Sequence, residues 1–165
     1  MRRFGLVVAL VALPTLAVLG LSTLTFGQES REFKAELSGA EEVPPVVTAA
    51  TGEVQFRVNA AQTEIAFELE IKNGTAILGA AGAHLHCARR GVNGPIIAFL
   101  AGPVQGGFDG KVAIKAVLTQ ANITNQSCGT TIAASVQAMR DGRVYANAHS
   151  PAHPTGEIRG QVEAD

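Results

Sequence analysis

The sequence predicts an all-β fold, namely an antiparallel, Greek-key-like β-sandwich of about eight strands with one short helix. Two observations predict it. Short runs of alternating apolar and polar residues recur at intervals of about ten residues, and each run is bounded by Gly, Pro or Asn. Helical periodicity is confined to one segment, residues 130–140.

The start of the chain has the layout of a secretory signal. Two arginines are followed by an apolar stretch that runs to about Leu19 and then by small and polar residues. Thr25 and Gly27 supply the small side chains that signal peptidase accepts, so we expect residues 1–27 to be cleaved and residues 28–165 to form one mature domain that is secreted or periplasmic. The alternative is a membrane anchor, because the apolar run approaches the length of a spanning helix.

The charge of the mature domain argues against nucleic acid as a partner. Removing the leader leaves 11 basic against 14 acidic residues, a net charge of −3. A nucleic-acid-binding domain is expected to carry an excess of basic residues. No segment after residue 27 is apolar enough to span a membrane.

The alternation is clearest in the second and third expected strands. Val54, Phe56 and Val58 share one face of their strand, and apolar residues alternate in the same way after residue 64. These two strands are predicted to form a hairpin around Asn59–Thr63. The full set of expected strands is Glu32–Leu37, Gly52–Val58, Glu64–Ile71, Gly79–Cys87, Pro95–Ala101, Gly107–Leu118, Arg143–Ser150 and Gly156–Val162.

Two local motifs interrupt the strand pattern. Thr130–Arg140 places apolar residues at helical spacing, has Thr130 or Thr131 as N-cap, and is followed by Gly142. We expect a short helix across one end of the sandwich. Asn73-Gly74, between two apolar runs, predicts a tight turn.

Cys87 and Cys128 are the only two cysteines of the chain. An even count in an exported protein favours a disulfide over free thiols. If the bond did not form, Cys87 would be a candidate metal ligand beside His86.

From Phe33 onward the chain resembles the CHRD family, the domain named for its occurrence in chordin. Four stretches carry the resemblance: LSGAEEVPPVVTAATGEVQF at 37–56, GAHLHCARRGVNGPII at 82–97, DGRVYANAHSPAHP at 141–154 and GEIRGQV at 156–162. The resemblance implies an extracellular β-sandwich. It implies no particular reaction, and the growth-factor-binding modules that accompany the domain in chordin are missing here.

The four histidines of the chain all fall within two of these stretches. His84 and His86 are two residues apart on one expected strand, so their side chains point to the same face at a separation that suits a shared ion. His149 and His153 would complete the site if the strand ending near Ser150 lay beside this one. Neutral imidazoles with few carboxylates suit copper or zinc, and binding is expected to fade below about pH 6. The alternative is that each histidine is a structural residue bonded to backbone.

The plan also resembles copper/zinc superoxide dismutase, an exported β-sandwich with a His-x-His strand and an arginine near its C-terminus. The zinc loop of that family, with its own histidines and aspartate, is absent from this chain. Glu157 and Arg159 alternate with Ile158 and share a face. We interpret them as a structural salt bridge or surface ladder, with anion attraction by Arg159 as the alternative.

Two functional hypotheses follow. The first is a non-enzymatic extracellular binding or structural module whose partner is an extracellular protein or surface ligand. It rests on the resemblance and on the lack of a nucleophile elbow, P-loop, dinucleotide fingerprint or paired catalytic carboxylates. The second is a copper- or zinc-binding metalloprotein that uses His84, His86, His149 and His153.

Overall fold

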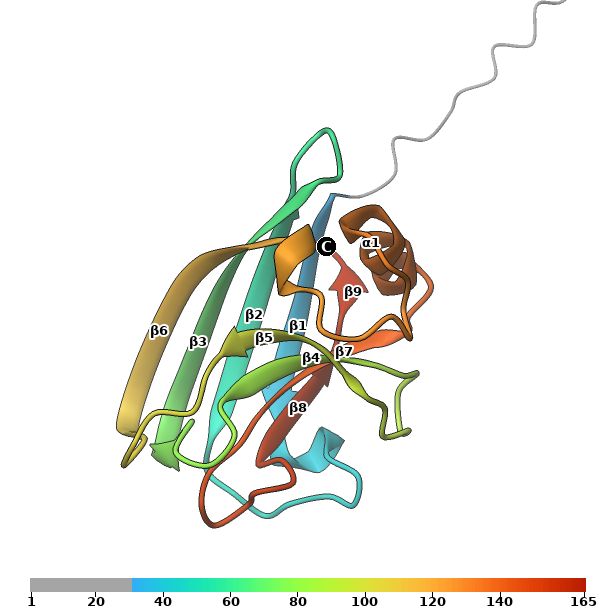
Figure 1. The fold of residues 1–165 in the computed structure, drawn as a ribbon. Coiled ribbons are helices and arrows are strands. Elements are labelled where there is room, and N and C mark those ends of the chain that lie inside the picture. Colours follow the sequence, from blue (N-terminus) through green and yellow to red (C-terminus); the bar gives the residue numbers. More distant parts are fainter. Residues whose placement is uncertain (1–30) are drawn as a thin grey trace, which may run out of the picture.

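A computed structural model describes residues 31–165, and the expected signal peptide lies outside these residues. The described part is mostly antiparallel sheet with one α-helix, as predicted (Figure 1). Its strands are β1 (Glu32–Ser38), β2 (Thr51–Val58), β3 (Glu64–Ile77), β4 (Ala83–Cys87), β5 (Ile96–Ala101), β6 (Phe108–Thr119), β7 (Val144–Ala148), β8 (Ile158–Gln161) and β9 (Glu163–Ala164). The helix is α1 (Ile132–Arg140), and two 3₁₀ turns are η1 (Gly39–Glu41) and η2 (Gln120–Asn122).

All the strands belong to one hydrogen-bonded sheet. Its order is β5-β4-β7-β8-β1-β2-β3-β6, with β9 paired to β1. The sheet curls on itself, so that β4, β5 and β7 lie across β1, β2 and β3 in a nearly closed barrel (Figure 1). The expected sandwich is therefore realised as two layers that remain joined where β8 pairs with β1, at Ser38 and Arg159.

Alternation along β2 and β3 builds one wall of the core. Phe56 lies opposite Phe67 and Val54 lies opposite Leu69, and all four side chains are buried. The two phenylalanine rings are 6.5 Å apart between centroids, within the range in which aromatic pairs attract. The predicted hairpin is confirmed, and in its turn the Asn59 side chain accepts a hydrogen bond from the backbone N–H of Thr63.

The turn predicted at Asn73-Gly74 is wrong. Strand β3 continues through both residues to Ile77 and stays paired with β6, with register shifts on either side of Gly74. Asn73 adopts a positive φ of 54°, which Asn tolerates better than most residues. The motif therefore forms a β-bulge within a long strand, because β6 supplies a partner that continues past the expected turn.

The predicted helix and the predicted disulfide are both confirmed. Thr131 is the N-cap of α1, and its side chain accepts a hydrogen bond from the backbone N–H of Ala134 at 3.1 Å. The Cys87–Cys128 bond, with its Cα atoms 5.6 Å apart, ties the end of β4 to the loop that precedes the helix. It also removes Cys87 from the candidate metal ligands.

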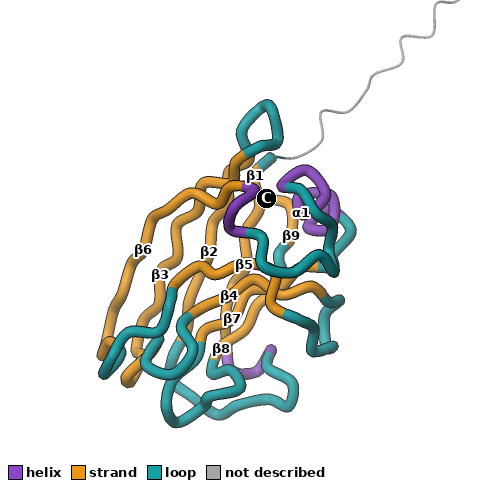
Figure 2. The backbone as a smooth tube through the Cα atoms, viewed as in Figure 1, coloured by secondary structure: helices purple, strands orange, loops and turns teal. Residues whose placement is uncertain are grey.

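Strands β4 and β7 are buried on both faces. One face contributes Leu85, Val144 and Ala146 to the apolar core. The opposite face carries polar side chains, and these are buried as well. Loops gather at the end of the barrel where η1 lies, and they include the segment between β7 and β8 (Figure 2). A doubly buried strand with one polar face calls for a specific explanation, because buried polar groups need partners.

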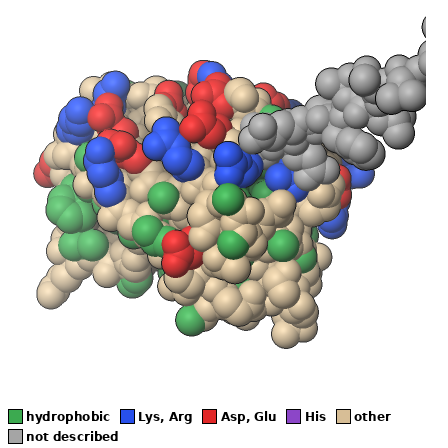
Figure 3. Space-filling model, turned by 90° about the horizontal axis from the view of Figure 1, so that it is seen from above, with side chains coloured by type: hydrophobic (Ala, Val, Ile, Leu, Met, Phe, Trp, Pro, Cys, Tyr) green, Lys and Arg blue, Asp and Glu red, His purple; other side chains and the backbone are tan. Residues whose placement is uncertain are grey.

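Exposed charges are interleaved rather than segregated. Basic and acidic side chains alternate on the face seen in Figure 3. Exposed ion pairs such as Lys115–Glu68 contribute little to stability and are screened by salt. Within residues 31–165, no helix is both long and apolar enough to cross a membrane.

Candidate metal centre

Strand β4 directs His84 and His86 to its outer, polar face. Because side chains alternate along a strand, the two rings share that face while Leu85 points into the core. β7 runs antiparallel beside β4, so that Asn147 lies opposite His84 and Tyr145 opposite His86. The pairing expected from the sequence is therefore present.

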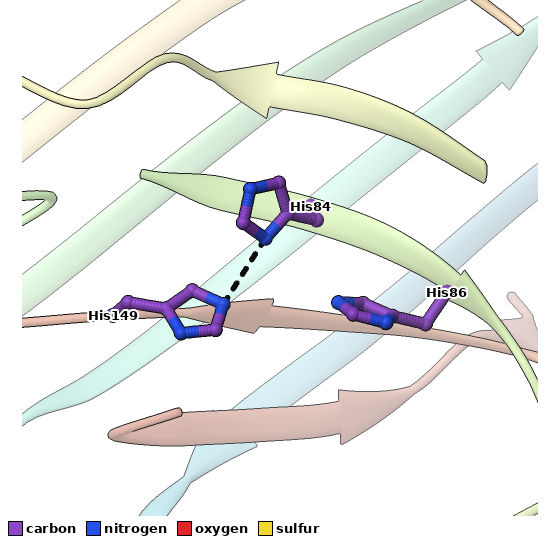
Figure 4. Close-up of side chains that lie close together, drawn as sticks. All are labelled: His84, His86 and His149. Carbon is purple, nitrogen blue, oxygen red and sulfur yellow. Dashed lines mark hydrogen bonds between the residues drawn. The ribbon is translucent and has the colours of Figure 1, made fainter. Parts of the chain in front are cut away.

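His149 follows β7 and reaches the same face. The antiparallel pairing sets the end of β7 beside Ala83, at the start of β4. The Nδ1 atom of His84 lies 3.0 Å from the Nε2 atom of His149 (Figure 4). One ring nitrogen from each of His84, His86 and His149 lies within 4.8 Å of the other two. The three residues are only 1%, 8% and 6% exposed, so the cluster is shielded from solvent.

Backbone carbonyls hold the far sides of the rings. His86 Nδ1 lies 2.8 Å from the Gly94 carbonyl oxygen, and His149 Nδ1 lies 3.1 Å from that of Pro154. A carbonyl can only accept a hydrogen bond, so the Nδ1 atom of His86 carries the hydrogen and its Nε2 atom, in the neutral ring, carries a lone pair. His149 faces an acceptor on both sides, the Pro154 carbonyl at Nδ1 and the Asn147 amide oxygen at Nε2, 3.1 Å away.

The Nε2 atom of His86 is buried and makes no hydrogen bond of ordinary geometry within the described protein, although the Asn147 side chain lies close to the ring. An unsatisfied buried polar atom costs about 1–3 kcal/mol. A lone pair of this kind, beside two further ring nitrogens, is what a metal ion requires of its ligands.

Aromatic and cationic groups enclose the cluster. The His86 ring stacks on Tyr145, with centroids 4.7 Å apart and planes inclined by 8°. The Arg159 guanidinium lies 3.5 Å from the centroid of the same tyrosine ring, a cation–π contact. The rings of Phe99 and His84 meet nearly at right angles, with centroids 4.7 Å apart. These contacts fix the orientation of the histidine rings.

Burial favours the neutral form of all three histidines. Loss of hydration, together with the nearby His149 and His86, lowers the pKa of His84 from 6.5 to about 4. Loss of hydration is also the main cause that lowers the pKa values of His86 and His149. The expectation that binding fades below about pH 6 therefore moves to lower pH, because protons compete for these nitrogens only in stronger acid.

Comparison with protein-family models gives one family. The CHRD domain model matches residues 33–162, most of the chain. The chain belongs to the CHRD-domain family. Comparison with curated proteins and with solved structures gave no match.

The four stretches that carry the CHRD resemblance meet at this cluster. The second stretch holds His84 and His86 together with Gly94, whose carbonyl bonds to His86. The third holds His149, the fourth holds Arg159, and the first contributes a buried carboxyl group close to Arg159. Segments far apart in the sequence thus supply the parts of a single site.

That carboxyl group, Glu42, is a site residue that sequence reasoning missed. It follows η1 and is 6% exposed, and its Oε1 atom has no hydrogen-bond partner within the described protein. Burial raises its pKa from 4.5 to about 7, against the opposing effects of the Arg159 charge, the Val43 backbone and the Asn147 side chain. Nothing in the EEVPP motif distinguishes the buried Glu42 from its neighbour Glu41, which forms an ion pair with Arg90.

His153, predicted as the fourth ligand, is not part of the three-histidine group. It lies in the loop between β7 and β8, where its backbone N–H donates to the Ser150 hydroxyl at 3.2 Å. That loop holds the backbone of His153 in a turn while His149 enters the cluster.

Glu157 and Arg159 are buried, so the expected surface ladder is wrong. Glu157 accepts a 2.7 Å hydrogen bond from the Thr48 hydroxyl. Arg159 donates to the Val92 carbonyl at 2.7 Å and to Asn93 Oδ1 at 2.9 Å. The two side chains are held by different loops, because the loops cover this face of the sheet.

Proposed function

We propose that this CHRD-domain protein is an exported, non-enzymatic module that binds one copper or zinc ion through His84, His86 and His149. The observation that carries the proposal is the convergence of three buried ring nitrogens, one of which has no partner within the described protein. The rings come from β4 and from the residue just after β7, so their positions are fixed by a paired sheet rather than by a free loop.

The chemistry of the donors suits these metals. Neutral imidazole is a common ligand of copper and zinc, whereas calcium and magnesium prefer oxygen. The carbonyls of Gly94 and Pro154 hold the opposite ring nitrogens, which is the outer support usual for metal-bound histidine.

A superoxide-dismutase-like role is less well supported. Such a role would need Arg159 to attract an anion toward the metal. Its donors instead bond to Val92 and Asn93, and its guanidinium rests on Tyr145. We therefore favour binding over catalysis.

Metal analysis and calorimetry test the site. Protein purified without an affinity tag should take up one equivalent of copper or zinc, and the double variant His84→Ala plus His86→Ala should lose it. His153→Ala is the matched control, since it removes a histidine of the same domain that lies outside the group, and it should bind as the wild type does. Equal, weak binding by the wild type and the double variant would leave the histidines as structural residues.

Export is tested separately. Mass spectrometry of protein secreted by an expressing cell should give a mature chain that begins after Gly27. A chain that stays in the membrane fraction with its leader attached would favour the anchor.

A further inference from the structure

The proposed site has no negatively charged donor among the described residues that converge on it. The converging donors are three buried histidines, without a carboxylate or thiolate. The ligands therefore neutralise none of the charge of a bound ion inside the protein. Building on the proposed function, we infer that the site selects monovalent copper, Cu(I), over divalent copper and divalent zinc.

Desolvation favours the smaller charge. The hydration free energy that an ion loses on burial grows with the square of its charge, so a divalent ion loses about four times as much as a monovalent ion of equal size. His84 is 1% exposed. Neutral imidazoles offset this loss less well than thiolates or carboxylates would, and the difference weighs most against divalent ions.

Arg159 adds a second penalty that scales with charge. Its guanidinium lies 3.5 Å from the Tyr145 centroid, which lies 4.7 Å from that of His86. The cation is thus within about 8 Å of the His86 ring, and its charge helps to lower the pKa of His86. At an effective dielectric constant near 20, a unit charge about 8–10 Å away weakens cation binding by roughly 15- to 30-fold for each unit of ionic charge.

The number of donors points the same way. The group offers three nitrogens, and zinc, which is usually four-coordinate, would need a water molecule to complete such a set. The amide oxygen of Asn147 lies 3.1 Å from His149 Nε2, but the Asn147 side chain also bonds to Glu42. Because the three histidines are buried, zinc would have to keep that water molecule inside the protein, which an ion that accepts three ligands does not need.

Glu42 sets the conditions of the test. When ionised, its carboxylate lies close enough to Arg159 to offset part of the guanidinium charge. Its pKa of about 7 leaves it mostly protonated at pH 6, where the full effect of Arg159 is therefore expressed.

The experiment compares three ions on one protein. Anaerobic competition with bicinchoninate measures Cu(I) affinity at about pH 6, and calorimetry measures Cu(II) and Zn(II) affinity. The wild type should bind Cu(I) the most tightly of the three. Arg159→Gln removes the charge and should raise the affinity for Cu(II) relative to Cu(I) by roughly 15- to 30-fold, which lowers the copper reduction potential by about 70–90 mV. Arg159→Lys keeps the charge and is the matched control.

Each outcome decides a different point. Wild-type protein that binds Cu(II) or Zn(II) as tightly as Cu(I) overturns the selection while the proposed metal site stands. An identical copper reduction potential in the Arg159→Gln and Arg159→Lys variants would also overturn the selection and leave the proposed metal site standing. Failure of the wild type to bind any of the three ions overturns the proposed function and the selection with it.

A second variant guards against misfolding of the Arg159 variants. Glu42→Gln removes the offsetting carboxylate and should shift selectivity the opposite way at about pH 8, further toward Cu(I). An unchanged or reversed ratio in that variant contradicts the electrostatic basis of the selection.

Discussion

Replacing Glu42 by Gln should stabilise the metal-free protein at pH 8 and leave its stability nearly unchanged at pH 4.5. Burial raises the pKa of this carboxyl group from 4.5 to about 7, so the folded state holds the proton more tightly than the unfolded chain does. Its contribution to stability is therefore fully present below about pH 4.5 and is lost as pH rises through 7. Gln has nearly the same shape and is neutral at every pH.

The magnitude follows from the size of the pKa shift. A rise from 4.5 to about 7 corresponds to about 3 kcal/mol between the two protonation states. Residual solvent screening reduces this figure, so we expect the Gln variant to gain about 2 kcal/mol at pH 8 relative to the wild type.

Urea unfolding at pH 4.5, 6 and 8, with chelator present and the disulfide intact, measures the difference. Glu64→Gln is the control, since Glu64 is an exposed residue at the start of β3 and its replacement gives the background effect of removing one carboxylate. A Glu42→Gln effect that is the same at all three pH values would show that the carboxyl group is not destabilised by burial.

Three further predictions test the fold and the site. Alkylation of the unreduced protein should leave both cysteines unmodified, and Cys128→Ala should lower the free energy of unfolding by about 4 kcal/mol in the chain-entropy model; modification of both thiols would reject the bond. Because the pKa of His84 is lowered to about 4, the protein should retain its metal in equilibrium dialysis as the pH is lowered to about 5. Metal release with a midpoint near the ordinary imidazole pKa of about 6.5 would contradict this. Gly156 has a φ of 139°, and an added Cβ would collide with the Glu42 carboxyl group. Gly156→Ala should therefore lower the free energy of unfolding by about 1–3 kcal/mol, measured by heat or urea. An unchanged unfolding midpoint would count against this packing.

Much of the fold could be predicted because the alternation of apolar and polar residues within each segment indicates a strand. The alternation of Val54 and Phe56 with polar residues predicts β2, because one face of the strand is buried. The same two-residue period puts His84 and His86 on one side of β4. The disulfide could be predicted because the chain has two cysteines and therefore one possible intrachain pairing. These inferences use neighbours in sequence or simple counting.

The remaining features depend on distant parts of the chain. Asn73 lies in a strand because β6 pairs with β3 beyond the expected turn. Glu42 is buried because the loop at Gly156 closes over it, and Arg159 is buried because Val92 and Asn93 cap its guanidinium. Local patterns carry no information on such coverage, so the sequence offers only a structural salt bridge or a surface ladder as the interpretation of Glu157 and Arg159.

The energetics of the polar face of β4 favour a ligand over a purely structural role. Burying imidazoles costs hydration, and the carbonyls of Gly94 and Pro154 recover it for only one nitrogen of each ring that they contact. The Nε2 atom of His86 remains unsatisfied within the described protein, although apolar residues at such positions would remove that cost. A metal ion would satisfy this atom and would take the place of the His84–His149 hydrogen bond. Metal binding should therefore raise the free energy of unfolding by an amount that grows with the logarithm of free-ion concentration, and a melting temperature that does not respond to copper or zinc would separate the cluster from any ligand role.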